Sequence, residues 1–273
     1  RHRHLWCSRV SIPPTILVFG GHDPTGGAGL QADIETIGAL GGHAVTVPTA
    51  LTLQDTQQVF GFEAVSTTLF RQQAEMLLEE FPVAAIKIGM VGSRPIFKAL
   101  HNLLLQHPTI PTVLDPVLAG GGGGALAENP LIEGIRTLLM PQSTLATPNR
   151  NELQRLVPEA DSIEQRATTL LQSGCAHLLV TGTDNPVPSE AADRVHHQLF
   201  QADGTQQQLD NPRLPHSYHG SGCTLASAIA TRIGMGDSIS DAVSSGLQFS
   251  WNSLQQGYQP AQGQHFPNRF FLS

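Results

Sequence analysis

Short apolar segments alternate along the chain with longer stretches in which apolar residues recur at helical spacing. The apolar segments predict six strands, over Thr15–Phe19, Ala44–Pro48, Ala84–Ile88, Thr112–Leu114, Thr144–Ala146 and Leu178–Val180. The stretches between them predict helices over Ala28–Leu40, Leu69–Glu80, Arg94–Leu105, Pro130–Leu139 and Ser162–Ser173. Alternation of this kind is typical of an α/β fold, with a mostly parallel sheet and helices on both of its faces.

The last third of the chain has a different pattern. Two alternating segments, Val195–Phe200 and Gln206–Leu209, predict a β-hairpin that turns at Asp203-Gly204. Helices are then expected over Gly222–Ile233 and Ile239–Gln255. No linker interrupts the pattern, so we expect one domain over residues 1–273. Residues 1–13 are expected to form a loosely ordered extension before the first strand. We do not expect them to be a signal peptide, because the apolar segment that follows Pro13 and Pro14 is too short for one.

Composition excludes several functional classes. The formal net charge of −7 argues against a nucleic-acid partner, which would require a basic face. No apolar run approaches the roughly 18 residues that a membrane span needs, so no membrane partner is expected. The cysteines, Cys7, Cys175 and Cys223, are odd in number and lack CxxC spacing, which fits neither a disulfide framework nor a zinc site. We therefore expect a cytoplasmic protein.

Four glycine-rich or polar segments follow predicted strands. They read GGHDPTGGAG, TALTLQDT, LDPVLAGGGGG and ATPNRNE. In open parallel sheets, ligands bind outside the carboxyl ends of the strands, so these segments should converge on one edge of the sheet. The chain has only two lysines, Lys87 and Lys98, and neither follows a glycine, which excludes a P-loop. Backbone amides, arginine or Mg²⁺ would have to neutralise any nucleotide phosphates.

The segment HGSGC, residues 219–223, precedes a predicted helix and offers those amides. Successive N–H groups at a glycine-rich helix start bind anions, and the same field favours a thiolate or a deprotonating donor at Cys223. An inert, buried cysteine at a tightly packed helix start explains the segment equally well. The order of residues does not match the GxSxG turn of serine hydrolases.

Two further segments carry oxygen ligands. Asp115 follows a strand, and Asn149 and Glu152 stand three residues apart at a helix start, so both can face one centre. These oxygens suit Mg²⁺ bound largely through water. Taken alone, Asn149 and Glu152 fit a helix-capping box better. The twelve histidines show no metal-binding spacing, and only His219 lies beside the expected site.

In their order and spacing, these segments resemble the hydroxymethylpyrimidine/phosphomethylpyrimidine kinases of thiamine synthesis, in the ribokinase-like superfamily. The matching text is GHDPTGGAGLQADIETIGALGGHAVTVPTALTLQDT, KIGMVGS, VLDPVL, TPNRNE and HGSGCTLASAIA, which together run through nearly the whole chain. The resemblance implies a three-layer α/β/α sandwich that phosphorylates a small pyrimidine alcohol, and then its monophosphate, with ATP and Mg²⁺. It also implies a homodimer.

The resemblance assigns roles to individual positions. The substrate pocket is implied at Gly21, Asp33, Gln54, Met90 and Val117, with His219 beside it. Cys223 is expected to assist deprotonation of the substrate hydroxyl while Gly220, Ser221 and Gly222 hold the phosphoryl group. Nucleotide contacts are expected from Asn149, Thr181 and Gly182, and Mg²⁺ contacts from Asp115 and Glu152.

The chain departs from the family pattern at three places. Thr181-Gly182 replaces the usual Lys-Gly, five glycines follow DPV, and an insert, DNPVPSEAAD, follows the strand near residue 181. The missing lysine normally contacts nucleotide phosphates, so we expect the alcohol to be phosphorylated and the monophosphate step to be weaker. A pyridoxal kinase and a pyrimidine-binding sensor with weakened catalysis are the alternatives.

Overall fold

The computed structural model of this chain describes residues 12–118, 129–183 and 193–271. The expected N-terminal extension lies almost entirely outside the described residues, as do the five-glycine run and nearly all of the insert. The strands are β1 Thr15–His22, β2 His43–Gln54, β3 Val59–Ala64, β4 Val83–Ile88, β5 Thr112–Leu114, β6 Leu145–Ala146, β7 His177–Val180, β8 Arg194–Gln201 and β9 Gln206–Pro212. The α-helices are α1 Gly29–Ala39, α2 Thr67–Glu80, α3 Arg94–Gln106, α4 Asn129–Gly134, α5 Arg150–Leu156, α6 Ile163–Gln172, α7 Ser221–Gly234 and α8 Ile239–Gln255.

Within the described ranges, the strands form one sheet in the order β3-β2-β1-β4-β5-β6-β7-β8-β9. Every pairing from β2 through β1, β4, β5 and β6 to β7 is parallel. The outer pairs β2–β3, β7–β8 and β8–β9 are antiparallel. The parallel centre places the carboxyl ends of these six strands at one edge of the sheet, as the alternation of elements predicts.

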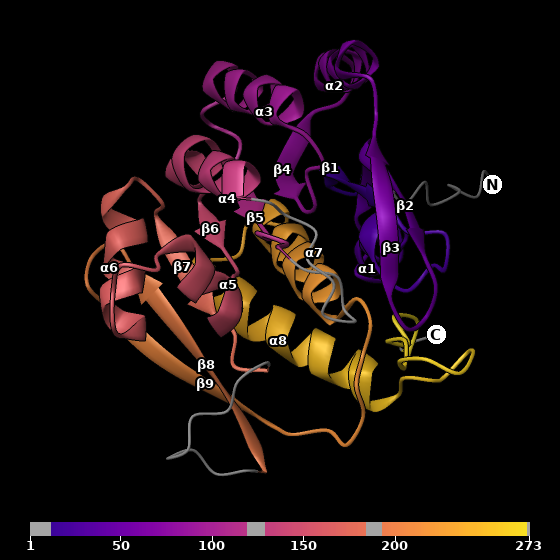
Figure 1. Cartoon of the computed structure of the whole chain (residues 1–273), viewed down its shortest axis with the longest axis vertical. Coiled ribbons are helices and arrows are strands. Elements are labelled where there is room, and N and C mark those ends of the chain that lie inside the picture. The colour runs from indigo at the N-terminus through magenta and orange to yellow at the C-terminus, as the bar shows by residue number, and fades with distance from the viewer. Residues whose placement is uncertain (1–11, 119–128, 184–192, 272–273) are drawn as a thin grey trace, which may run out of the picture.

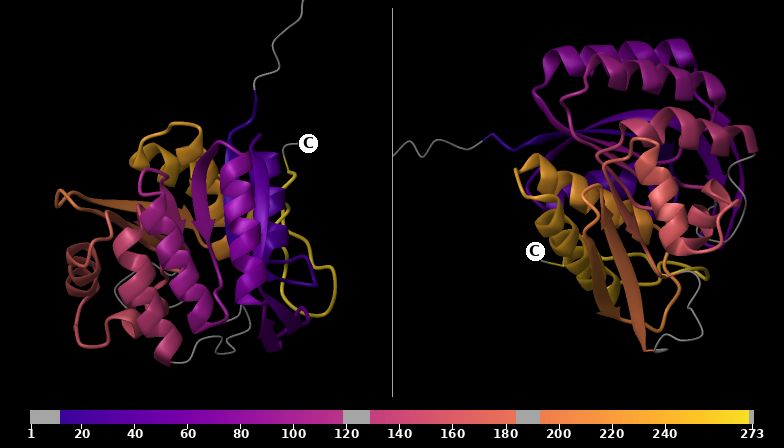
Figure 2. Two further views of the ribbon diagram at one scale, coloured as in Figure 1. Left: turned by 90° about the horizontal axis from the view of Figure 1, so that it is seen from above. Right: turned by 90° about the vertical axis from the view of Figure 1, so that its left-hand side faces the viewer.

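Two helical layers cover the sheet, which confirms the predicted α/β/α sandwich (Figures 1 and 2). Side chains of α2, α3, α5 and α6 pack against one face, where Leu17, Phe19, Ile86 and Ile88 alternate with residues that point to the other face. Helices α1, α7 and α8 cover that second face. Apolar residues point to both sides of the central strands because both faces are buried, as expected for a parallel sheet.

The second strand is longer than its apolar core predicts. The expected loop segment TALTLQDT instead continues β2 as far as Gln54. This extension pairs with β3, a strand that the apolar pattern does not predict. The reason is alternation: Thr52 and Gln54 face the cavity described below, whereas Leu51 and Leu53 point outward and are half exposed or more.

Helix α4 is also shorter than expected. The predicted helix Pro130–Leu139 is α-helical only to Gly134 and continues as a π-helical turn over Ile135–Leu139. Among the described residues, no helix combines the length and the apolar character needed to cross a membrane.

Candidate active site

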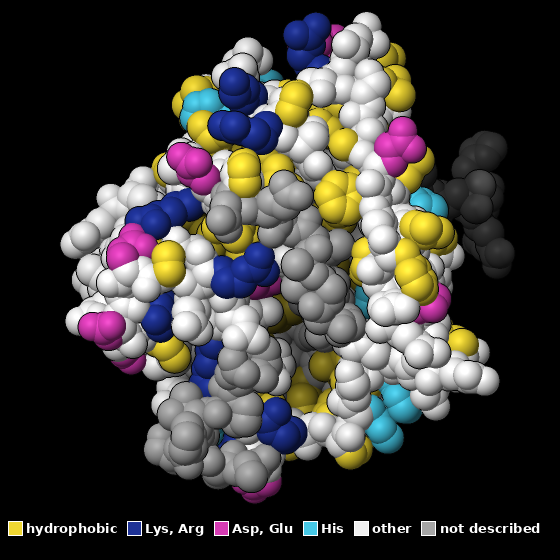
Figure 3. Space-filling view, viewed as in Figure 1, with side chains coloured by type: hydrophobic (Ala, Val, Ile, Leu, Met, Phe, Trp, Pro, Cys, Tyr) yellow, Lys and Arg dark blue, Asp and Glu magenta, His cyan; other side chains and the backbone are white. Residues whose placement is uncertain are grey.

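The polar segments that follow the parallel strands surround one cleft at the carboxyl edge of the sheet. Its volume is about 570 Å³, within the range typical of small-molecule sites. Figure 3 shows the hollow in this face of the molecule, with hydrophobic side chains on its floor. The predicted convergence of these segments is therefore confirmed.

Most of the residues singled out from the sequence line this cleft. They are Gly21, Gln54, Met90, Asp115, Val117, Asn149, Glu152, Thr181, His219, Gly220, Ser221, Gly222 and Cys223. Two do not: Asp33 is fully buried behind the wall, and Gly182 lies beside the wall next to Thr181.

The segment GGHDPTGGAG, residues 20–29, which we call the glycine block, is held in place by Asp23. Its carboxylate accepts hydrogen bonds from the backbone N–H of Thr25 and Ala28, each at 2.8 Å, and from the Thr25 hydroxyl. His219 Nε2 lies 2.9 Å from the same carboxylate, and both side chains are buried. Burial acts to raise the pKa of Asp23, but the hydrogen bonds from His219 and Thr25 outweigh it and lower that pKa. His219 thus lines the cleft while its Nε2 ties the anion-binding segment to the glycine block.

The start of α7 presents three backbone N–H groups to the cleft. Gly220, the N-cap, has φ +83° and ψ 13°, a left-handed conformation that glycine adopts without strain. In the described part of the chain, no protein acceptor pairs with the N–H groups of Ser221, Gly222 or Cys223. Unpaired amides at a helix N-terminus attract anions, so residues 220–223 form an anion cradle.

Cys223, the last residue of this cradle, lines the cleft. Burial raises the pKa of its thiol to about 12, although the Lys87 charge and the Gly29 backbone N–H act in the opposite direction. Desolvation of the sulfur thus favours the thiol over the thiolate, against the field of the helix, and the role expected of Cys223 stays a prediction. Cys223 carries a proton at neutral pH.

Beneath the cradle lies a buried ion pair. Lys87 Nζ donates to Asp33 Oδ1 at 2.9 Å, and both side chains are at most 1% exposed. Ser227 Oγ on α7 donates to the same Oδ1 at 2.6 Å. Burial opposes the charge on Lys87, but Asp33, Cys223 and Asp115 outweigh it and raise the pKa of Lys87. Asp33, predicted to contact the substrate, instead holds a charged lysine behind the cleft wall.

Asp115 and Glu152, the predicted Mg²⁺ contacts, both lie on the cleft wall. Burial raises the pKa of Asp115 to about 6. Glu152 completes the helix-capping box that the sequence favoured: Asn149 Oδ1 accepts from the Glu152 N–H at 2.8 Å, and Glu152 Oε2 accepts from the Asn149 N–H at 2.9 Å. Glu152 thus caps α5 while it also lines the cleft, so one residue can serve both the helix start and a ligand.

The side of the cleft away from β1 is formed by β7, β8 and α8. A single parallel bridge joins Asn149 to Thr181. A Cβ at Gly182 would lie 2.1 Å from the His196 carbonyl oxygen, so only glycine allows β8 to approach this closely. Apolar side chains dominate this part of the wall: Val195, Pro212, Leu214, Leu247, Trp251 and Leu254.

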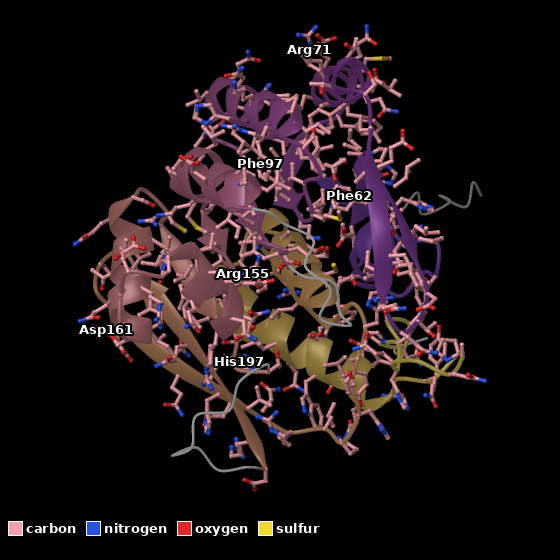
Figure 4. The ribbon with its side chains drawn as sticks, viewed as in Figure 1. Phe62, Arg71, Phe97, Arg155, Asp161 and His197 are labelled. Atoms are coloured by element: carbon pink, nitrogen blue, oxygen red, sulfur yellow. The ribbon has the colours of Figure 1, made fainter. Side chains whose placement is uncertain are left out.

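Several cleft residues were not recognised in the sequence. Arg155 and Arg213 line the wall and bring positive charge (Figure 4 shows Arg155 on α5 and His197 on β8). Neither arginine belongs to a recognisable motif. The buried ion pair of Lys87 could have been predicted, because a lysine within the apolar run AAIKIGM is expected to be buried and therefore to have an anionic partner.

Comparisons with known proteins agree with this geometry. The phosphomethylpyrimidine kinase family model matches residues 23–268. The hydroxymethylpyrimidine/phosphomethylpyrimidine kinase of Streptomyces coelicolor is 33% identical over 252 residues, which cover 90% of each chain. The enzyme of the same name from Haemophilus influenzae is 28% identical over 264 residues, or 94% of this chain and 97% of the relative.

Solved structures show the same fold. The pyridoxal kinase of Staphylococcus aureus in complex with pyridoxal has a TM-score of 0.84 at 25% identity, covering 96% of this chain and 95% of that one. The phosphomethylpyrimidine kinase of Clostridium difficile has a TM-score of 0.73 at 28% identity, covering 89% and 98%. With the family model matching most of the chain and a cleft built from the matching segments, this protein belongs to the phosphomethylpyrimidine kinase family.

Proposed function

We propose that this protein transfers the terminal phosphoryl group of ATP to the hydroxymethyl group of 4-amino-5-hydroxymethyl-2-methylpyrimidine, and more slowly to the resulting monophosphate. The observation that carries this proposal is the anion cradle: the N–H groups of Ser221, Gly222 and Cys223, which have no acceptor among the described residues, lie at a cleft of substrate size. The names of the relatives support the same substrates.

The pyrimidine binds at the β1 end of the cleft. Met90 and Val117 cover its faces, and the Gln54 amide reads its ring nitrogens and amino group, since all three side chains line this end. Gln54 is oriented from behind, because its Nε2 donates to Thr52 Oγ1 at 2.6 Å. The role we predicted for Asp33 is revised accordingly: it acts through Lys87 and not by contact.

The nucleotide binds along the opposite half of the cleft. The flat base lies among the apolar side chains between β8 and α8, where Trp251 is fixed by donation of its Nε1–H to the Pro212 carbonyl at 2.9 Å. Asn149 and Thr181 lie between this apolar part and the cradle, and they contact the phosphates. The terminal phosphate then rests on the cradle.

Catalysis rests on positioning and charge. Phosphoryl transfer passes through a loose transition state, which asks the protein mainly to align the reactants and stabilise negative charge. The cradle supplies amide dipoles, and the buried Lys87 supplies a fixed positive charge close to Cys223 and Asp115. The Cys223 thiol, protonated at the outset, orients the acceptor hydroxyl. As the hydroxyl oxygen bonds to the terminal phosphorus and the bond from that phosphorus to ADP breaks, the thiol passes its own proton to an oxygen of the transferred phosphoryl group and takes the hydroxyl proton in return.

The donor set fits Mg²⁺. Asp115 is a carboxylate on the cleft wall whose pKa is raised mainly by burial and further by Asp33, although the Lys87 charge acts in the opposite direction. Asp115 would hold the ion, with Glu152 contacting it through water, because the capping box already engages the Glu152 carboxylate. When bound, Mg²⁺ neutralises charge on the triphosphate.

A coupled assay of ADP release with each acceptor tests the proposal. The alcohol should be phosphorylated with a higher kcat/KM than the monophosphate, because Thr181 provides no positive charge for the additional phosphate. Arg155 and Arg213 offset part of that loss. Equal kcat/KM for the two acceptors contradicts the weaker second step, and no turnover of either contradicts the proposed function.

Pyridoxal phosphorylation is the second candidate. It is favoured by the likeness to the pyridoxal kinase of Staphylococcus aureus, whose solved complex holds pyridoxal. Thermal-shift measurements with the pyrimidine alcohol, its phosphate, pyridoxal and ribose separate the candidates, because the preferred ligand raises the Tm most. A homodimer stays a prediction from the family resemblance, which light scattering on the purified chain tests.

A further inference from the structure

The largest fully buried side chain of the described residues belongs to Arg269, in the segment that follows α8. Figures 1 and 2 show this C-terminal segment returning beside the β2–β3 hairpin, where Gln264 N–H donates to the Thr56 carbonyl at 2.9 Å. Arg269 therefore lies far from the glycine block and the cradle in sequence but close to both in space. It was not among the residues selected from the sequence.

Arg269 forms hydrogen bonds to both the glycine block and the first turn of α7, which carries the cradle. One guanidinium nitrogen donates to the Gly27 carbonyl at 2.5 Å, within the glycine block that follows β1. Its Nε donates to Thr224 Oγ1 at 2.9 Å, on the first turn of α7. The third nitrogen forms an ion pair with Glu35 on α1, again at 2.9 Å. A planar guanidinium has donors in the directions that such a triple contact requires.

The bond to Thr224 continues into the cradle. Thr224 Oγ1 donates in turn to the Gly220 carbonyl at 2.8 Å, and the Thr224 backbone N–H donates to the same oxygen at 3.0 Å. Holding that carbonyl fixes the Gly220–Ser221 peptide, and with it the direction in which the first N–H of the cradle points. The chain Arg269–Thr224–Gly220 thus sets the orientation of the cradle.

The glycine block and the cradle are also in direct contact. A Cβ at Gly220 would lie 1.9 Å from the Gly27 carbonyl and 2.9 Å from the Arg269 guanidinium. The glycine block and the cradle therefore meet at the Gly27 carbonyl, which Arg269 binds. A change in this contact would alter the separation between the glycine block and the cradle, and with it the separation between the acceptor hydroxyl and the terminal phosphate in the reaction proposed above.

We propose that Arg269 is a positioning residue for phosphoryl transfer, which positions the cradle through Thr224 and the glycine block through Gly27. Arg269 and Thr224 lie outside the cleft wall. Their effect on catalysis is therefore indirect. The proposal rests on the kinase function proposed above.

Thr224→Val tests the branch to the cradle, and Thr231→Val is its matched control. Thr231 is equally buried on the same helix, and its hydroxyl also donates to the carbonyl four residues earlier, at 2.7 Å. We expect Thr224→Val to lower kcat at least tenfold and to raise the KM for ATP severalfold, with the KM for the pyrimidine within twofold of wild type. Thr231→Val should lose a similar amount of Tm without these kinetic changes. Thr224→Ser, which keeps the hydroxyl, should restore the wild-type values.

Arg269→Lys tests both branches, because one ammonium group cannot serve Gly27, Thr224 and Glu35 together. It should lower kcat at least tenfold and raise both KM values while the chain remains folded. Equal kinetics in Thr224→Val and Thr231→Val, or failure of Thr224→Ser to restore kcat, overturns the proposal.

Calorimetric binding of tripolyphosphate separates this failure from failure of the kinase assignment. Even if wild-type protein turns over no acceptor, Thr224→Val should weaken tripolyphosphate binding severalfold relative to Thr231→Val. Equal affinities of these two variants overturn the positioning role, whereas absent turnover alone overturns the proposed reaction.

Discussion

Gly220→Ala is the most direct perturbation of the cradle. Residue 220 has φ +83°, and an added Cβ would lie 1.9 Å from the Gly27 carbonyl oxygen. Such contacts are essentially never shorter than 3.0 Å, so the two segments must separate by about 1 Å. Both contact atoms are close to the backbone, so rotation of a side chain cannot relieve the clash.

The cost has two parts. The left-handed conformation costs an alanine about 1–2 kcal/mol of folding stability. Misplacement of reacting groups by about 1 Å costs about 100-fold in rate, or about 2.7 kcal/mol of barrier. We therefore expect kcat to fall about 100-fold, with a lower Tm.

Gly204→Ala provides the matched control. Gly204 has φ +85° in the β8–β9 turn, and its added Cβ meets nothing within 4 Å. This variant should pay the same conformational cost and keep its kcat. The assay is ADP release at saturating ATP and pyrimidine, with Tm measured on both variants. A kcat for Gly220→Ala equal to that of Gly204→Ala would falsify the role assigned to the cradle.

Three other perturbations follow from the buried charges. Lys87→Met leaves Asp33 buried without its cation and should cost about 3–5 kcal/mol of unfolding free energy in urea; an unchanged free energy contradicts the ion pair. With a pKa of about 12, Cys223 should react with iodoacetamide at pH 8 roughly a thousandfold more slowly than a free thiol, and rapid alkylation contradicts that pKa. Asp115 has a pKa raised from 3.8 to about 6, so its ionisation costs stability as the pH rises through this interval, and the full cost is present above pH 6. Asp115→Asn should therefore raise the Tm at pH 8 but not at pH 4, while kcat falls at least 100-fold; a Tm that is unchanged at pH 8 refutes the linkage.

The sequence by itself determined the architecture and the place of the site. Alternating strand and helix patterns imply a parallel sheet, and in such a sheet the segments after the strands must meet at one edge. That rule brought Asp115, Asn149 and the cradle together without any knowledge of distances. Local patterns suffice here because periodicity records which face of each element is buried.

Only the tertiary structure decided how particular side chains are used. Asp33 has the residue type and position of a substrate contact, but packing of α1 on β1 and α7 places it against Lys87, 54 residues away, and Ser227. Whether Cys223 is a thiol or a thiolate depends on the water excluded around it, which no spacing of residues records. Arg269 reaches Gly27 across 242 residues. Such contacts come from how distant elements pack, and a local pattern carries no information about its distant partner.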